Sequence, residues 1–185
     1  MKFIAYTSLL HADKSPLGLA DEHIETEKML ADSGIVYTLL RTAGTPKTTS
    51  PAPAALEHGV FIGAVGDGKI ASATRADYAA AAARVISEAG HEGKFYELAG
   101  DSALTLTELA VELTKQSGKS VTYQNLSEAD FAAALKSVGL PDGLADMLAD
   151  SDVGASKGGL FDTAKRLANS LAANDNVSRK RKPSF

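Results

Sequence analysis

The 185-residue sequence contains no cysteine, which excludes a disulfide framework and a metal site built on thiolates. No apolar run reaches the roughly 18 residues that a membrane helix needs. The apolar start, residues 3–10, is short and mixed with hydroxyl side chains, and no small-residue cleavage site of a signal peptide follows it. With 44% hydrophobic and 23% charged residues, the composition is typical of a globular protein, and we expect a cytoplasmic location.

The sequence also lacks an excess of positive charge, since the net charge is −4. Phosphate backbones are bound by clustered cations, so this balance argues against a nucleic-acid partner. One run of four cations occurs at residues 179–182, and we interpret it as part of an unstructured tail. The four histidines are too scattered to predict a metal site.

The sequence lacks the glycine-rich turn of dinucleotide-binding folds. Gly63, Gly66 and Gly68 do not have the G-x-G-x-x-G spacing, and residues 69–72, which follow them, are typical of a strand rather than a helix. We therefore predict a β-hairpin, with residues 63–68 as the turn between strands at 60–62 and 69–72. No tyrosine has a lysine four residues later, so the proton-donor pair of short-chain dehydrogenases is absent too.

What is present is an α/β pattern. Residues 3–8 form an apolar run that ends in hydroxyl side chains and predict a buried strand. A helical pattern over 19–33 ends at Gly34, and a second buried strand is predicted at 35–40. A strand, helix and strand of these lengths form a parallel βαβ crossover. The later elements are an irregular segment at 42–53, helices at 76–89, from the capping box Thr105–Glu108, from Ser127 and at 141–150, and strands at 94–98 and 121–124.

Candidate site residues lie near the ends of the first two strands. Thr7 and Ser8 could donate hydrogen bonds to a ribose or carbonyl, or could simply cap the strand end. Arg41 could meet a phosphate, although a buried ion pair is the commoner use of such an arginine. His23 and Glu27 are one helical turn apart and could move protons, but a structural pair is the commoner arrangement.

Several separated segments agree in order with one known family. They are Lys2-Phe-Ile-Ala-Tyr-Thr-Ser-Leu-Leu10, His23-x-x-x-Glu27-x-x-Leu30-x-x-Ser33-Gly34-x-x-Tyr37-Thr38-x-Leu40-Arg41, Gly66-Asp-Gly68, Arg75-x-Asp77-Tyr78-Ala79, Tyr96-Glu-Leu-Ala-Gly100 and Thr105-x-x-Glu108-x-Ala110. From residue 2 to about 161 the chain resembles the NmrA-like branch of the atypical short-chain dehydrogenases. Within that branch it is similar to the bacterial NAD(P)H:quinone oxidoreductases of the second type.

The resemblance implies a partial Rossmann-like parallel sheet over 1–58, without its N-terminal strands. It also implies a smaller C-terminal α/β substrate subdomain over 59–162, followed by a divergent, disordered tail over 163–185. NADPH would be the hydride donor and a quinone the acceptor. We predict that Thr7, Ser8 and Arg41 contact the cofactor and that His23 lies on the substrate side. No catalytic side chain or metal is predicted, because a quinone stacked on the nicotinamide can take the hydride directly.

The chain also departs from this family. The family's first four strands and its glycine-rich turn are missing, and residues 42–47 replace an expected Asn-Gly and aromatic-rich stretch. We therefore expect a truncated NmrA-like NAD(P)H:quinone oxidoreductase. The alternatives are a non-catalytic regulator that senses nucleotide or binds a protein, and a nonfunctional remnant. Because an open sheet would expose the apolar strand at 3–5, we also expect a homodimer or marginal stability.

Overall fold

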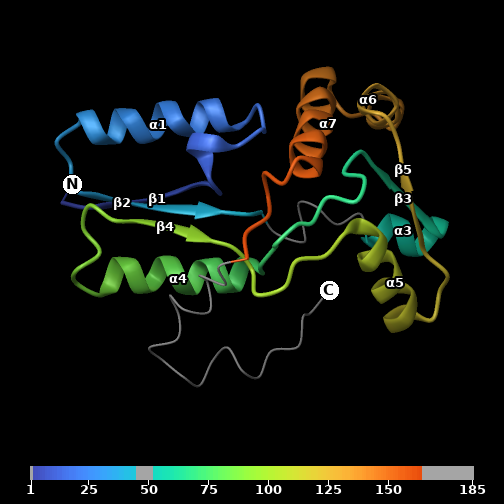
Figure 1. The fold of residues 1–185 in the computed structure, drawn as a ribbon, viewed down its shortest axis with the longest axis horizontal. Coiled ribbons are helices and arrows are strands. Elements are labelled where there is room, and N and C mark those ends of the chain that lie inside the picture. Colours follow the sequence, from blue (N-terminus) through green and yellow to red (C-terminus); the bar gives the residue numbers. More distant parts are fainter. Residues whose placement is uncertain (1, 45–51, 164–185) are drawn as a thin grey trace.

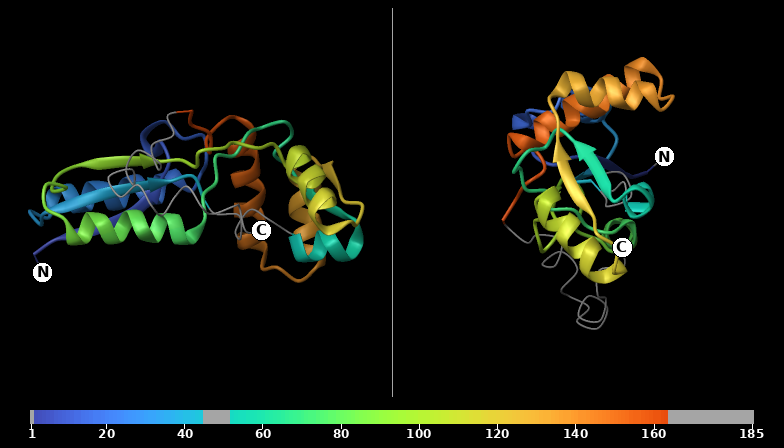
Figure 2. Two further views of the ribbon diagram at one scale, coloured as in Figure 1. Left: turned by 90° about the horizontal axis from the view of Figure 1, so that it is seen from below. Right: turned by 90° about the vertical axis from the view of Figure 1, so that its right-hand side faces the viewer.

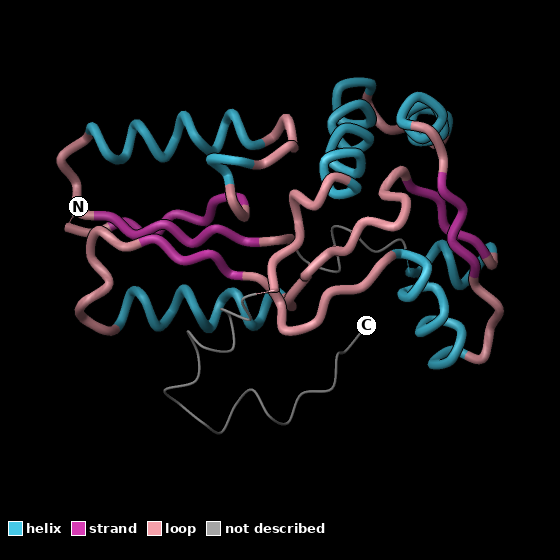
Figure 3. Tube along the Cα trace, viewed as in Figure 1, coloured by secondary structure: helices cyan, strands magenta, loops and turns pink. Residues whose placement is uncertain are grey.

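Two parallel sheets organise the part of the chain that the structure, a computed structural model, describes, namely residues 2–44 and 52–163 (Figure 1). The first sheet has the order β1-β2-β4, with β1 at Ile4–Leu9, β2 at Tyr37–Thr42 and β4 at Phe95–Leu98. The second sheet pairs β3 at Val60–Gly63 with β5 at Thr122–Asn125. Figure 3 shows both sheets in magenta, at opposite ends of the molecule.

Helices cover both faces of the first sheet. The βαβ crossover predicted from the sequence is confirmed, because β1 and β2 are parallel and α1 (Ala20–Asp32) connects them. Helix α4 (Arg75–Ser87) covers the opposite face (Figure 1). There Leu40 and Leu98 of the sheet pack on Ala81 and Val85 of α4.

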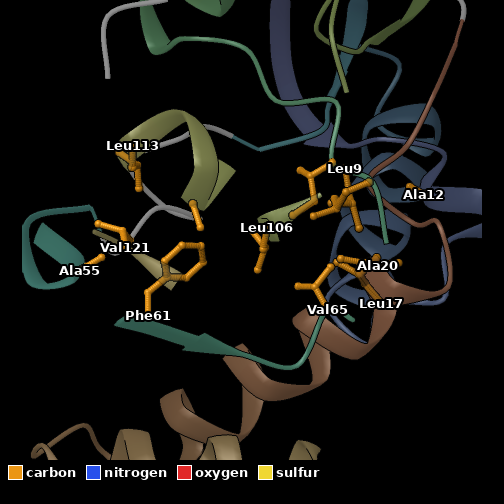
Figure 4. Packing of buried hydrophobic residues seen from close by; sticks show 14 residues of the cluster. Leu9, Ala12, Leu17, Ala20, Ala55, Phe61, Val65, Leu106, Leu113 and Val121 are labelled. Carbon is orange, nitrogen blue, oxygen red and sulfur yellow. The ribbon is translucent and has the colours of Figure 1, made fainter. Parts of the chain in front are cut away.

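The second sheet is covered by α3 (Ala52–His58) and α5 (Leu106–Ser117), and α6 (Glu128–Ser137) packs against α7 (Asp142–Ser156). Figure 2 shows α7 between the two sheets. One buried cluster contains side chains from both regions: Leu9 and Leu17 lie in the same core as Phe61 and Leu106 (Figure 4). The two sheets are therefore parts of one packed body.

Local capping signals explain where several helices begin. The predicted capping box at Thr105 and Glu108 is confirmed, and Thr74 and Asp77 form a second one at the start of α4. Helix α5 ends at Gly118, whose φ of 72° is a left-handed conformation that glycine adopts without strain.

The predicted hairpin is wrong. Strand β3 pairs in parallel with β5, and Ile70 forms only an isolated antiparallel bridge with Leu104. The parallel pairing places the Phe61 ring against the Tyr123 ring, with centroids 5.2 Å apart, and buries Phe61 in the shared core. Two further differences concern helices. Helix α3 begins within the segment expected to be irregular, and α7 continues past the expected end at residue 150 to Ser156, with small residues such as Gly154 and Ala155 buried along it.

The sequence-based division at residues 58 and 59 stays a prediction. In the structure, α4 and β4 follow this division in sequence but pack on the first sheet. The predicted tail lies outside the described residues except for residue 163. Within the described ranges, no helix is long and apolar enough to cross a membrane.

Candidate functional site at the strand ends of the first sheet

A row of three polar side chains crosses the first sheet near the carboxyl ends of its strands. Ser8 of β1 lies opposite Arg41 of β2, and Arg41 lies opposite Glu97 of β4. Side chains directly across a sheet point to the same face, so all three face α1. Glu27 of α1 meets this row and completes it.

Arg41 is surrounded by carboxylates. Its Nε and Nη2 donate to the two Glu27 oxygens at 2.9 and 2.6 Å, a bidentate pair. Its Nη1 donates to Glu97 at 3.0 Å and to Asp13 at 2.7 Å. The side chain is only 12% exposed, and it lies over the Phe95 ring with its Cζ 5.5 Å from the centroid. We call Ser8, Arg41, Glu27, Glu97 and Asp13 the Arg41 cluster.

The electrostatics of this cluster keep its central pair charged. Burial would raise the pKa of Glu27, but hydrogen bonds from Arg41 and Ser8 and the arginine charge outweigh it, so that pKa is lowered. The hydrogen bond to Glu27 also raises the pKa of Arg41, against the effect of burial. The pair is therefore ionised at neutral pH, and three carboxylates share one guanidinium.

His11 follows β1 in an uncommon conformation. Its φ of 49° is the only positive value among the described non-glycine residues. Its backbone N–H donates to Glu97 Oε2 at 2.8 Å, and its imidazole Nε2 lies 3.2 Å from Asp162. The end of β1 is thereby connected to the last described segment of the chain, where Leu160 accepts a hydrogen bond from Ala71.

The structure brings only some of the predicted site residues together. Ser8 and Arg41 share Glu27, whereas Thr7 is exposed and points to the opposite, α4-covered face. The expected pair of His23 and Glu27 is wrong, because His23 Nδ1 is hydrogen-bonded to the Tyr6 hydroxyl at 2.9 Å. The Glu27 carboxylate is instead paired with the Arg41 guanidinium.

Sequence reasoning missed three members of this site: Glu97, Asp13 and His11. Only Glu97 gave a signal, as a charged residue inside the short apolar strand predicted at 94–98. The structure shows its side chain 7% exposed, so its charge needs a partner from elsewhere in the chain. His11 lies just after β1 and Asp13 lies in the short 3-10 helix η1 (Ala12–Lys14), and their partners are distant in sequence.

The glycine-rich loop after β3 forms a second, separate arrangement. Its three consecutive amides, those of Ala64, Val65 and Gly66, are each held by a side chain. They donate respectively to Asp152 Oδ2 at 2.8 Å, the Tyr123 hydroxyl at 3.2 Å and Asn125 Oδ1 at 2.8 Å. We call this the loop network. Burial raises the pKa of Asp152, partly offset by the hydrogen bond from Ala64, and burial also raises the pKa of Tyr123.

Neither the Arg41 cluster nor the loop network fits the diphosphate of NADPH. A diphosphate needs free amides or cations. The loop amides are taken by side chains, and Arg41 is taken by three carboxylates. The first turn of α1 carries Asp21 and Glu22, whose charge would repel a phosphate. No group of three or more potential metal ligands occurs within residues 2–44 and 52–163.

The sequence and fold of the chain are similar to those of known reductases. No protein-family model matches the chain. It is 86% identical over 169 residues to quinone oxidoreductase 2 of Escherichia coli. The aligned region covers 91% of this chain and 59% of that protein. The structure of an NADPH-dependent quinone oxidoreductase from Escherichia coli, complexed with NADPH, matches with a TM-score of 0.89 and 84% identity, over 93% of this chain and 61% of that one. Triphenylmethane reductase of Citrobacter sp. matches with a TM-score of 0.84 and 34% identity, over 92% and 60%.

The chain is therefore an α/β protein whose structural neighbours are Rossmann-like NAD(P)-binding reductases. The chain is similar to these reductases over most of its own length, so the resemblance predicted from the sequence is confirmed. The chain spans about 59% of the length of the Escherichia coli relative.

Proposed function

We propose that this chain takes part in the NADPH-dependent reduction of a quinone. It would supply the substrate-binding part of the active site and one wall of the cofactor cleft. The residues that bind the diphosphate would lie outside the described part of the chain. The observation that carries the proposal is the 86% identity to quinone oxidoreductase 2 of Escherichia coli, with 91% of this chain aligned.

The Arg41 cluster would act here as a support. Its ion pairs fix Ser8 and, through Glu97, the backbone of His11, at the strand ends where sheets of this type bind ligands. Within the proposal, Thr7 and Ser8 are contacts for an uncharged part of a cofactor, and His23 lies on the substrate side. An Arg41 contact to a phosphate would require one of its carboxylates to leave.

A reconstituted protein tests this proposal. The 185-residue chain is joined to the portion of the Escherichia coli relative that it does not match, and menadione reduction is followed by the loss of NADPH absorbance. We expect the chain alone to be inactive and the reconstituted protein to reduce menadione. A reconstituted protein that folds and binds NADPH but leaves menadione unreduced would refute the proposal.

The same assay separates the second candidate function. A nucleotide-sensing regulator would bind NADPH as the isolated chain and still show no turnover. The crowding of Arg41 by carboxylates argues against this alternative. We also propose that the protein is located in the cytoplasm and forms a homodimer.

A further inference from the structure

Helix α7 lies between the two sheets (Figure 2) and contacts one loop from each of them. The first loop, which we call the β1 loop, is residues 10–19 and connects β1 to α1. The second loop, which we call the β3 loop, is residues 64–68 and follows β3. The β1 loop contains Asp13 of the Arg41 cluster, and the β3 loop provides the three amides of the loop network.

Two carboxylates of α7 hold these loops by their backbones. In the β1 loop, the Gly18 amide donates to Asp150 Oδ2 at 2.8 Å. In the β3 loop, the Ala64 amide donates to Asp152 Oδ2 at 2.8 Å. Both acceptors lie within a single turn of one helix, so a movement of this turn changes the geometry of both hydrogen bonds.

The next turn of α7 packs closely on both loops. A methyl group on Gly154 would lie 2.5 Å from Cγ of Leu17 in the β1 loop. A methyl group on Gly68 of the β3 loop would lie 2.7 Å from the Ala155 carbonyl oxygen and from Ser156 Cα. Both distances are far shorter than the about 3.5 Å of van der Waals contact, so these positions of close approach require glycine.

Side chains of the two loops also meet in the shared core. Leu17 of the β1 loop and Val65 of the β3 loop belong to the same buried cluster as Ala155 of α7 (Figure 4). Close-packed interiors are barely compressible and therefore transmit strain. A displacement on one side of this contact has no empty space in which to be absorbed.

We propose that the end of α7 joins the two loops into one unit, so that a displacement of one loop is passed to the other. Beyond the helix, Asp162 lies 3.2 Å from Nε2 of His11 and adds a further contact to the β1 loop. Coupling of this kind is reciprocal, so a change in the β3 loop must also alter the β1 loop. A ligand that moves one loop would thereby change the other, whether or not the chain turns over a quinone.

Hydrogen exchange of the 185-residue chain, resolved by residue with NMR, tests the coupling. Gly154→Ala presses directly on Leu17, and we expect the Gly18 amide to exchange about tenfold faster. The coupling predicts a similar increase at the Ala64 amide, although Ala64 belongs to the other loop. Gly143→Ala is the matched control in α7, because its methyl group would point into open space, and it should not speed exchange at either amide.

The reverse direction uses Gly68→Ala, whose methyl group would press on the α7 backbone from the β3 loop. We expect the Gly18 amide, in the β1 loop, to exchange about tenfold faster. The Gly93 amide, which donates to Tyr37 at the amino ends of the strands, reports global destabilisation and should be unchanged.

Circular dichroism shows whether the variants fold. If either glycine variant does not fold, Asp152→Ala replaces it, because it removes the acceptor of the Ala64 amide without adding atoms. It should speed exchange at Gly18 as well as at Ala64. The proposal is overturned if exchange is faster only in the loop that the substitution contacts, if neither loop changes, or if the Gly93 amide changes as much as the remote loop.

Discussion

The Arg41 cluster and the loop network both lie at the carboxyl ends of parallel strands, but they are built differently. The first holds a cation among three carboxylates, whereas the second holds three backbone amides with side-chain oxygens. In both, groups that a phosphate would use are already satisfied. The comparison shows that the position at strand ends does not by itself make a phosphate site, and that the two arrangements should respond differently to substitution and pH.

Removal of the central cation should have the largest effect. Arg41→Met leaves Glu27 and Glu97 largely buried without a counterion, and we expect a loss of about 3–5 kcal/mol in the free energy of unfolding. Lys136→Met is the control, because Lys136 forms an exposed pair with Asp146 whose loss costs about 0.5 kcal/mol. Urea unfolding at pH 7 measures both. Equal losses would mean that the cluster contributes no more than a surface pair.

Glu27→Gln should have a smaller effect that depends on pH. The lowered pKa of Glu27 means that its contribution is present above the pKa of the unfolded chain and is lost as pH falls through the folded pKa. We expect a loss of about 2 kcal/mol at pH 7. The difference from the unsubstituted chain should shrink in acid, as followed by urea midpoints across pH. A difference that is constant with pH would contradict the assigned ion pair.

In the loop network, Tyr123→Phe removes the hydroxyl that accepts from Val65 and donates to Asn125 at 2.9 Å. Because the ring packing on Phe61 is kept, we expect a loss of about 1 kcal/mol. Hydrogen exchange should show faster exchange at the Val65 amide. Unchanged exchange there would mean that the hydroxyl does not hold the loop.

Asp152→Asn should produce the smallest effect, and in the opposite direction. Burial raises the pKa of Asp152, so its ionisation costs stability as pH rises above the pKa of the unfolded chain. An asparagine oxygen can still accept from Ala64 without a buried charge, and we expect a gain of about 0.5 kcal/mol at pH 7. Thermal unfolding should show this gain fading toward acid pH. Destabilisation at every pH would contradict this account.

Local signals made much of the fold predictable. The βαβ unit follows from apolar runs and Gly34, and the capping box at Thr105 fixes the start of α5 within a few residues of sequence. The pairing of β3 with β5 was missed because the partner strand lies about 60 residues away along the chain and sheet register is a non-local choice.

The candidate site shows the same limit. Ser8 and Arg41 could be placed at strand ends from sequence, but their surroundings could not. Glu97, which completes the row, becomes a neighbour only when β4 joins the sheet beside β2. His23 and Glu27 are one helical turn apart, yet they have different partners. His23 is hydrogen-bonded to Tyr6 of β1, and Glu27 is paired with Arg41 of β2.

Calorimetric titration of NADPH into the 185-residue chain tests the central claim most directly, with the Escherichia coli relative as the positive control. The claim is that the guanidinium of Arg41 and the three amides of the loop network are already bound within the protein. We expect a measurable affinity for the relative and no micromolar binding by this chain. Micromolar binding that is abolished by Arg41→Met, in protein that circular dichroism shows to be folded, would contradict the claim.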